Sequence, residues 1–227
     1  TNYSYHFEWL GRPIIQYPQD IVAMQNLIWT VKPDLIIETG IARGGSLIFY
    51  ASILKLISLN NKIRSPKVLG VDIDIRKHNK KSILSHPMSK YIEMIEGSST
   101  NKSIFEQIKK KSKKAKKILV ILDSKHTHHH VLEEIKLYAP LVSKGSYIVV
   151  FDTIIDELPN KYNKTRPWSK GNSPKTAVFE YLETHPEFEI DKSIQNKLLI
   201  TVAPDGYLKR IWQICKKYDV LYILLIS

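Results

Sequence analysis

Short apolar runs alternate with segments of helical hydrophobic spacing from about residue 33 to residue 203. Apolar, β-branched runs such as Ile118–Leu122 are typical of strands that are buried on both faces. The predicted strands lie at residues 34–38, 68–72, 91–96, 118–123, 147–152 and 197–203. The predicted helices lie at residues 46–57, 76–85, 101–114, 128–138 and 174–184. This alternation predicts an α/β domain with a doubly wound, mostly parallel, Rossmann-like sheet and helices on both faces.

Two segments flank this pattern. Residues 1–32 are interpreted as a partly helical N-terminal cap, and residues 33–210 as the Rossmann-like domain. Residues 211–227 form an apolar tail, which we expect to dock on the domain or to make an oligomer contact, so a homo-oligomer is predicted. The apolar stretch of the tail, residues 218–226, is shorter than the roughly 18 residues that a membrane span needs.

The charge of the chain changes this picture little. Its 227 residues include 34 lysines and arginines against 22 acidic residues, a formal net charge of +12. Such a balance is common in nucleic-acid-binding proteins, but seven of the lysines lie within residues 109–117. They precede a predicted strand, at the sheet edge opposite to the one that binds ligands. We interpret them as a solvated helix end, and nucleic acid is not favoured as a partner.

Cysteine usage points to the compartment. The single cysteine, Cys215, excludes an internal disulfide framework and a CxxC metal site. No apolar segment near Thr1 has the character of a signal peptide. We therefore expect a reduced, cytoplasmic setting.

Small and acidic residues follow the predicted strands, at the edge where open parallel sheets bind ligands. The first loop, residues 40–45, has the glycine pattern G-x-x-x-G-G, which is neither the dinucleotide fingerprint nor a P-loop. Asp72 ends the second strand, where a carboxylate can accept the ribose hydroxyls of a nucleoside or, alternatively, cap a helix. A glycine loop and this acidic residue, without a pyrophosphate loop, favour a nucleoside such as S-adenosylmethionine.

A second cluster is predicted around Asp123 and Asp152, which end adjacent strands. Their carboxylates would repel each other unless a cation or proton lay between them, and an oxygen-rich site suits Mg²⁺. The alternative is that each caps a helix or pairs with a lysine. His126 is a candidate general base, because its unperturbed pKa is near neutral.

The histidines after Asp123 also allow another interpretation. Asp123, His126 and His128 have the composition of a two-histidine-one-carboxylate Fe(II) site, as in non-haem oxygenases. His128, His129 and His130 enter the next predicted helix and point in different directions, so at least one of them should be exposed.

A long loop at residues 159–174 leaves the fifth predicted strand at the same edge. It contains Arg166, Trp168 and Lys170, and it is placed to cover a flat or anionic substrate. The alternative is a plain surface excursion.

Six ordered motifs resemble the cephalosporin hydroxylase/rhamnosyl O-methyltransferase family. They are F-x-W-x-G-R-P-I (7–14), E-T-G-I-A-R-G-G-S (38–46), L-G-V-D-I-D (69–74), I-E-G-S-S (95–99), L-D-S-K-H-T-H-H-H-V (122–131) and G-S-Y-I-V-V-F-D-T (145–153). The resemblance covers about residues 5–210 and implies a class I, S-adenosylmethionine-dependent methyltransferase. The motif order is also similar to that of catechol-type, metal-dependent O-methyltransferases.

The resemblance implies a role for each matching residue. The residues implied around the methionine part of the cofactor are Glu38, Gly40, Arg43, Gly44 and Ser46. Asp72 would bind the ribose, and Gly97, Ser98 and Ser99 would lie near the adenine. Asp123 and Asp152 would hold Mg²⁺, with Thr153 where catechol-type enzymes have an asparagine ligand. The family is expected to carry a glutamate before Asp152, and this chain carries Phe151 instead.

These roles give a mechanistic hypothesis. Mg²⁺ lowers the pKa of an acceptor hydroxyl, His126 removes its proton, and the oxygen attacks the methyl group. The candidate catalytic residues are Asp123, Lys125 and His126. The acceptor is a small molecule or a glycan, with sugars, polyketides, β-lactams and lipid-linked glycans all open. The alternatives are the iron oxygenase and a catalytically degenerate binding protein on the same fold.

Overall fold

The structure is a computed structural model that describes residues 3–60, 63–159 and 165–211. Its main sheet has seven strands in the order β5-β4-β3-β6-β7-β9-β8. These are β3 (Leu35–Thr39), β4 (Lys67–Asp72), β5 (Ile92–Glu96), β6 (Ile118–Leu122), β7 (Tyr147–Val150), β8 (Phe188–Ile190) and β9 (Tyr207–Arg210). The pairs among β3 to β7 are parallel, and β9 is antiparallel to both of its neighbours. The predicted mostly parallel, doubly wound sheet is confirmed.

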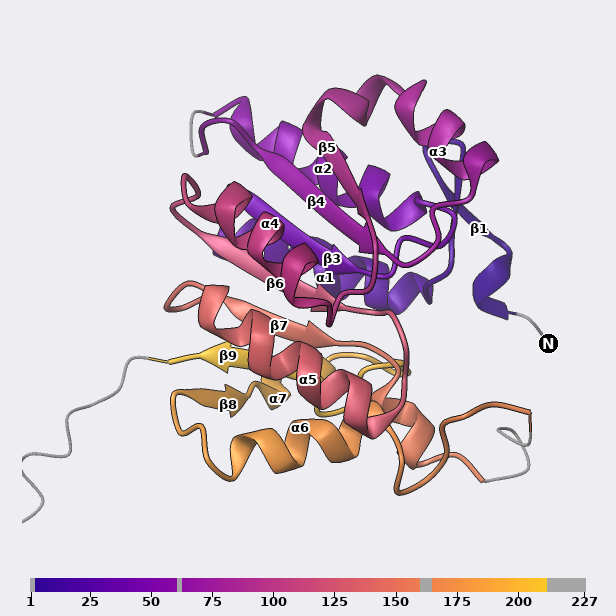
Figure 1. The fold of residues 1–227 in the computed structure, drawn as a ribbon, viewed down its shortest axis with the longest axis vertical. Helices are drawn as coiled ribbons and strands as arrows, with labels where there is room; N and C mark the ends of the chain where they lie inside the picture. Colours follow the sequence, from indigo (N-terminus) through magenta and orange to yellow (C-terminus); the bar gives the residue numbers. More distant parts are fainter. Residues whose placement is uncertain (1–2, 61–62, 160–164, 212–227) are drawn as a thin grey trace, which may run out of the picture.

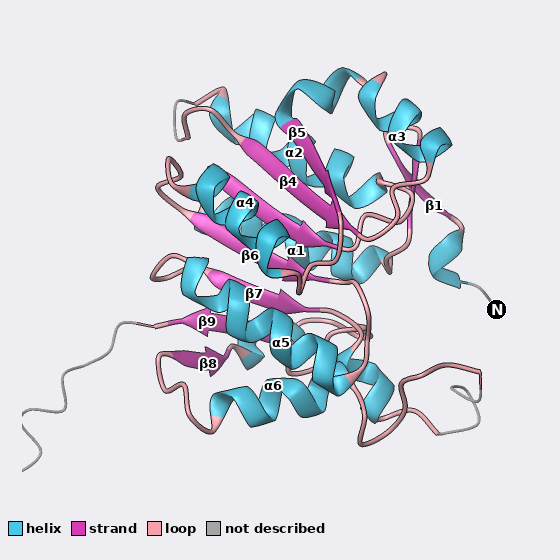
Figure 2. Ribbon diagram, viewed as in Figure 1, coloured by secondary structure: helices cyan, strands magenta, loops and turns pink. Residues whose placement is uncertain are grey.

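Helices cover both faces of this sheet (Figures 1 and 2). The α-helices are α1 (Pro18–Val31), α2 (Gly45–Ser58), α3 (Lys77–Leu84), α4 (Lys102–Ser112), α5 (His128–Tyr138), α6 (Pro174–Leu182) and α7 (Lys192–Gln195). Short 3-10 helices lie at η1 (Tyr3–Tyr5), η2 (Pro87–Tyr91), η3 (Ala139–Leu141) and η4 (Thr153–Asp156). Among the described residues, no helix has the length and apolar character that crossing a membrane requires.

Alternate residues of each strand pack into two separate cores, as the pleat of a strand requires. On one face, Ile36 and Leu119 pack with α1 and α2. On the other face, Ile37 and Val120 pack with α4, α5 and α6. Burial on both faces explains why β6 and β7 are apolar at every position and why the sequence pattern located the central strands.

Helix α1 belongs to the first of these cores. Met24, Leu27 and Ile28 are buried in it together with residues of α2. A small antiparallel hairpin, β1 (Phe7–Trp9) and β2 (Arg12–Ile14), precedes α1. The N-terminal segment therefore contributes a layer of the sheet domain as well as a hairpin beside it.

The predicted last strand at residues 197–203 is wrong. This segment has no strand structure, and Leu199 within it is 92% exposed. The edge of the sheet is formed instead by β8 and β9, each only three or four residues long. Residues 201 and 202 are held by buried Asp20 of α1, which accepts hydrogen bonds from the Thr201 hydroxyl and the Val202 amide. An apolar run that packs against a helix end can resemble a strand in sequence.

Gly40 follows β3 and lies directly against the carboxyl end of β6. Its φ is +91°, and a Cβ atom there would lie 2.0 Å from the carbonyl oxygen of Asp123. Gly40 also donates a backbone hydrogen bond of 2.8 Å to the carbonyl of Val71 at the end of β4. Glycine is therefore required here both for the backbone conformation and for the close approach.

We predict that Gly40→Ala destabilises the fold far more than Gly145→Ala. Gly145 has a φ of +70° but open space around its Cβ position, so its substitution carries only the left-handed backbone cost, roughly 1–2 kcal/mol. Gly40→Ala adds a clash with the backbone of Asp123. Urea unfolding of both variants measures the difference, and equal losses of stability would contradict the steric argument.

Candidate active site

The loop between β3 and α2 is fixed by hydrogen bonds to the carboxylate of Asp72. Oδ2 of Asp72 accepts hydrogen bonds from the amides of Ile41, at 2.7 Å, and Ala42, at 3.2 Å. Its Oδ1 accepts from the amide of Asp74 at 3.1 Å. Asp72 therefore joins the loop after β3 to the end of β4, where the sequence placed a nucleoside-binding carboxylate.

A second anchor holds the same loop from outside the sheet. Asn79 of α3 donates to the carbonyl of Ala42 at 3.0 Å, and Arg12 of β2 donates to the carbonyl of Arg43 and to Asn79. Gly45, the first residue of α2, lies so close to β2 that a Cβ would be 2.2 Å from the Pro13 carbonyl oxygen. The hairpin and α3 together fix the course of the loop.

A cavity of about 230 Å³ opens beside this loop, along the carboxyl ends of the central strands. Of the predicted site residues, Gly40, Asp72, Ser98, Ser99, Asp123 and Lys125 line it. Val71, Ile73, Ala42, Ser124 and His130 complete the wall. Carboxylate and hydroxyl groups together with the apolar side chains of Val71 and Ile73 suit a nucleoside, with a sugar to bind and a base to cover.

Glu38 is fully buried beneath the loop. Its Oε2 accepts a hydrogen bond of 2.8 Å from the hydroxyl of Ser46, while Oε1 has no hydrogen-bond partner within the described residues. Burial, with a smaller contribution from the charge of Asp72, raises the pKa of Glu38 to about 8. A buried carboxylate with an unpartnered oxygen is suited to a cationic group, such as the ammonium of the methionine part implied by the resemblance.

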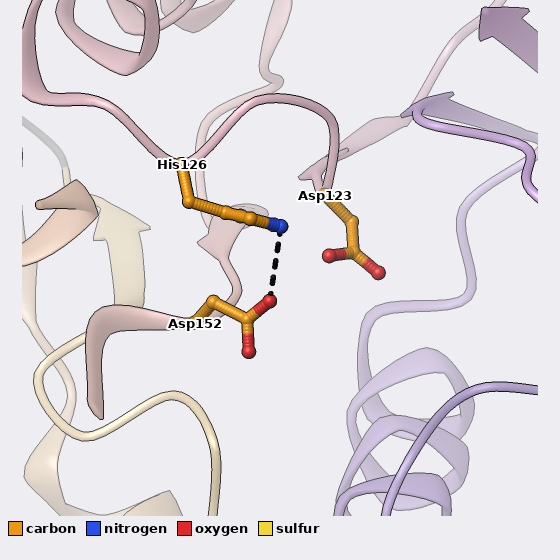
Figure 3. Close-up of side chains that lie close together, drawn as sticks. All are labelled: Asp123, His126 and Asp152. Atoms are coloured by element: carbon orange, nitrogen blue, oxygen red, sulfur yellow. Dashed lines mark ion pairs between the residues drawn. The ribbon is translucent and has the colours of Figure 1, made fainter. Parts of the chain in front are cut away.

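The sheet edge also brings together Asp123, His126 and Asp152 (Figure 3). Nε2 of His126 lies 3.2 Å from Oδ2 of Asp152, and one ligand atom from each of the three residues lies within 4.8 Å of the others. Burial, together with the charges of Asp152 and Glu38, raises the pKa of Asp123 well above its usual range. Carboxylates forced together in this way fit a divalent cation, which would offset their repulsion.

A second, smaller cavity of about 130 Å³ lies on the other side of Asp123. It is lined by Ser4, Tyr5, Ile15, Gln16, Asp123, Phe151, Asp152 and Val202. Asp123 therefore lines both cavities. The predicted covering loop reaches the same place, because the ring of Trp168 packs edge-on against His126 with centroids 4.8 Å apart. Arg166 lies over the other side of the Trp168 ring, 5.3 Å from its centroid.

Three further predicted residues adjoin the first cavity without lining it. Gly44 has a φ of +82° and begins α2, and Arg43 packs over the ring of Tyr5 at 6.0 Å. Gly97 lies against Ile104 of α4 and donates to the Asp72 carbonyl. These residues shape the walls of the site.

The predicted ligand role of Thr153 has no support in the geometry. Its side chain is fully buried, and its hydroxyl donates to the carbonyl of Pro204 at 2.6 Å. That bond anchors the turn before β9 and directs the Thr153 hydroxyl to the Pro204 carbonyl.

The structure does not assemble the two-histidine-one-carboxylate site. His128 turns toward α6, where its ring nitrogens lie 2.8 Å from the Thr176 hydroxyl and 3.0 Å from the Glu180 carboxylate. His129 is 83% exposed, as expected for at least one of the three. His130 turns to the first cavity, which the sequence did not indicate. The single signal for it is its spacing of four residues from Glu134, a buried acid that accepts from Ser124.

The fold and the site define a class I methyltransferase, the kind that uses S-adenosylmethionine. A sequence model of the family described as Rhamnosyl O-methyltransferase/CmcI matches residues 1–211. The chain belongs to this family, as the motifs predicted.

Relatives and solved structures agree with this assignment. The Rhamnosyl O-methyltransferase of Mycobacterium tuberculosis (strain ATCC 25618 / H37Rv) is 33% identical over 193 residues, 84% of this chain and 73% of the relative. The Rhamnosyl O-methyltransferase of Mycobacterium leprae (strain TN) is 32% identical, over 89% of this chain and 82% of the relative. The solved structure described as "cmcI-D160 Mg-SAM" has a TM-score of 0.63 at 19% identity, over 92% of this chain and 78% of that one, which shows the fold.

The raised pKa of Glu38 predicts a pH dependence of stability. The ordinary value of 4.5 for the unfolded chain rises to about 8 in the fold, so the folded state binds more protons between these values. The free energy of unfolding contributed by Glu38 is therefore fully present below about pH 4.5 and is lost as the pH rises through about 8. Glu38→Gln should flatten this decline.

Thermal unfolding of the ligand-free protein between pH 5 and 9 measures the effect. Glu96→Gln, at the exposed end of β5, is the matched control and should leave the slope unchanged. If the melting temperatures of Glu38→Gln and of the unaltered protein fall equally with pH, Glu38 is not the source of the pH dependence of stability.

Proposed function

We propose that the protein transfers the methyl group of S-adenosylmethionine to a hydroxyl of a sugar, of the rhamnosyl type or a related glycan. The observation that carries this proposal is the position of Asp123, which lines both the nucleoside-sized cavity and the smaller cavity beside it. A methyl donor in the first and a hydroxyl in the second would meet at this residue. The sugar acceptor is supported by the two mycobacterial relatives, both rhamnosyl O-methyltransferases.

The loop of residues 40–45 and Asp72 bind and orient the cofactor in this proposal. Asp72 lines the first cavity, and its Oδ1, which among the described residues accepts from the Asp74 amide alone, retains a lone pair for a ribose hydroxyl. Glu38 offers its unpartnered oxygen to a cationic group. Ser98 and Ser99, on the loop after β5, border the far end of that cavity.

The acceptor side is formed by different elements. Asp123, His126 and Asp152 surround the place where the acceptor hydroxyl is activated, and Trp168 offers an aromatic surface for the sugar ring. Tyr5 and Gln16, from the N-terminal segment, close the cavity and help to exclude water. S-adenosylmethionine supplies the electrophilic methyl group, and a divalent cation, when bound, lowers the pKa of the hydroxyl. Positioning of the two reactants supplies much of the rate.

Self-association and a cytoplasmic location stay predictions from the sequence. A role for the protein in lipid or glycan biosynthesis follows from the proposed acceptor and is part of the same proposal.

The direct test is formation of S-adenosylhomocysteine from S-adenosylmethionine with different acceptors. We expect turnover with a p-nitrophenyl α-rhamnoside and little with catechol, each assayed with added divalent cations. Turnover with catechol alone would overturn the sugar acceptor. Failure to bind S-adenosylmethionine by calorimetry would overturn the methyltransferase function and favour a degenerate binding protein.

We predict that Asp72→Asn weakens S-adenosylmethionine binding by roughly 10–100-fold, because hydrogen bonds to a charged group contribute about 1.5–3 kcal/mol. The asparagine keeps the shape and one acceptor for the loop amides. Calorimetry gives the dissociation constant, with Asp74→Asn, an exposed carboxylate two residues further on, as the control. A change of less than about twofold would remove the ribose assignment.

For the covering loop, we predict that Trp168→Ala raises the KM for a rhamnoside several-fold and leaves the dissociation constant of S-adenosylmethionine unchanged. The reason is that Trp168 packs beside His126 on the acceptor side of Asp123. Trp29→Ala, at a half-exposed position on α1, is the matched control. A loss of cofactor binding in Trp168→Ala would place this tryptophan in the other cavity.

A further inference from the structure

The end of β7 supplies one carboxylate to the ion-binding cluster, where the family resemblance implies two. Phe151 stands at the position of the expected glutamate, and it is 2% exposed within the core that contains α1 and α2. Its amide donates to the carbonyl of Leu122 at 3.0 Å, which extends the pairing of β7 with β6. The Phe151 side chain has no atom that could bind an ion, so Asp152 is the only carboxylate that the end of β7 contributes.

His126 supplies a third donor beside the two carboxylates. Two atoms bound at right angles to one ion, each at roughly 2.1 Å, lie about 3 Å apart, and Nε2 of His126 lies 3.2 Å from Oδ2 of Asp152. Figure 3 shows this nitrogen pointing into the gap between the carboxylates of Asp123 and Asp152. The rings of Trp168 and His126 form a T-shaped pair with an interplanar angle of 88°, a contact that favours this position of the imidazole.

The backbone of Asp152 is consistent with a binding role rather than a capping role. Asp152 has φ 56° and ψ 22°, the left-handed conformation, which is uncommon for a residue other than glycine. It precedes the short helix η4, but its side chain makes no capping hydrogen bond there. The helix-cap alternative is therefore not realised for Asp152, and its carboxylate faces His126 instead.

We propose that Asp123, His126 and Asp152 form a three-residue site that prefers a divalent first-row transition-metal ion, such as Mn²⁺ or Co²⁺, over Mg²⁺. Mg²⁺ takes oxygen ligands, whereas an imidazole nitrogen favours the transition metals. The inference rests on the proposed function only in placing the ion beside the acceptor hydroxyl. It also replaces the role of general base that the sequence predicted for His126, since a nitrogen bound to an ion is not free to take a proton. The proton of the acceptor hydroxyl, whose pKa a bound ion would lower, would then pass to water.

The test compares ions rather than activities. Calorimetric titration of the chelator-treated protein with MgCl₂ and with CoCl₂ gives two dissociation constants, and their ratio measures the preference. His126→Asp changes the donor set to three carboxylates. We expect it to lower the ratio of the Mg²⁺ dissociation constant to the Co²⁺ dissociation constant by about tenfold or more. The visible absorption of bound Co²⁺ should also change, because a nitrogen donor has been removed.

The matched control is His129→Asp on α5, which makes the same change at an exposed position and should leave the ratio unchanged. His126→Gln, which keeps a neutral side chain, replaces His126→Asp if circular dichroism shows that the aspartate variant does not fold, and it should weaken Co²⁺ binding more than Mg²⁺ binding. An unchanged ratio in the folded variant, or equal affinity of the unaltered protein for both ions, would overturn the inference.

The proposed function is read separately, by S-adenosylmethionine binding and methyl transfer. If methyl transfer is observed but the ratio is unchanged in His126→Asp, the proposed transition-metal preference is overturned and the methyltransferase function is supported. If the ratio depends on His126 but the protein does not bind S-adenosylmethionine, the proposed metal site is supported and the proposed methyltransferase function is overturned.

Discussion

The close contact between Gly40 and the backbone of Asp123 is the constraint on which the site depends. It lets the loop after β3 pass directly over the end of β6, with no side chain between them. The cofactor loop and the ion-binding cluster are thereby held at one point of the sheet edge. Asp72 fixes the same loop from β4, so three neighbouring strands determine the position of one turn. The separation of the two proposed binding cavities by a single residue, Asp123, follows from this arrangement.

The second general feature is the concentration of acidic groups at this edge. Glu38, Asp72, Asp123 and Asp152 lie at or just after the ends of four neighbouring strands, β3, β4, β6 and β7, and burial raises the pKa of both Glu38 and Asp123. The net charge of the chain is nevertheless +12, and its densest basic run, residues 109–117, lies at the opposite edge. The molecule thus has an acidic site within a basic protein. Such a site favours positively charged ligands, among which are a sulfonium cofactor and a divalent ion.

The acceptor side is built from segments that are far apart in the sequence. Residues near the N-terminus, the loop that contains Trp168, and Val202 converge around Asp152. Buried Asp20 of α1 holds the segment of Val202 in place through hydrogen bonds across 182 residues of chain. Variation in the Trp168 loop and around Val202 can change the acceptor without altering the cofactor loop, whereas the N-terminal segment also anchors that loop through Arg12.

The sequence by itself determined the sheet from β3 to β7, its helices, the family and the edge that carries the site. Buried parallel strands such as β6 and β7 are runs of apolar residues, and the glycines and carboxylates at the ends of the strands leave a clear local pattern. The short edge strands β8 and β9 have no such pattern, because their pairing depends on partners distant in the chain, and residues 197–203 resembled a strand instead. Only the tertiary structure decided that His126 faces Asp152 while His128 faces α6, since direction on a helix or loop is set by packing. It also paired the Thr153 hydroxyl with the Pro204 carbonyl, a contact that no local spacing encodes. The four-residue spacing of His130 from Glu134 does not by itself show that His130 lines the first cavity beside Ser99.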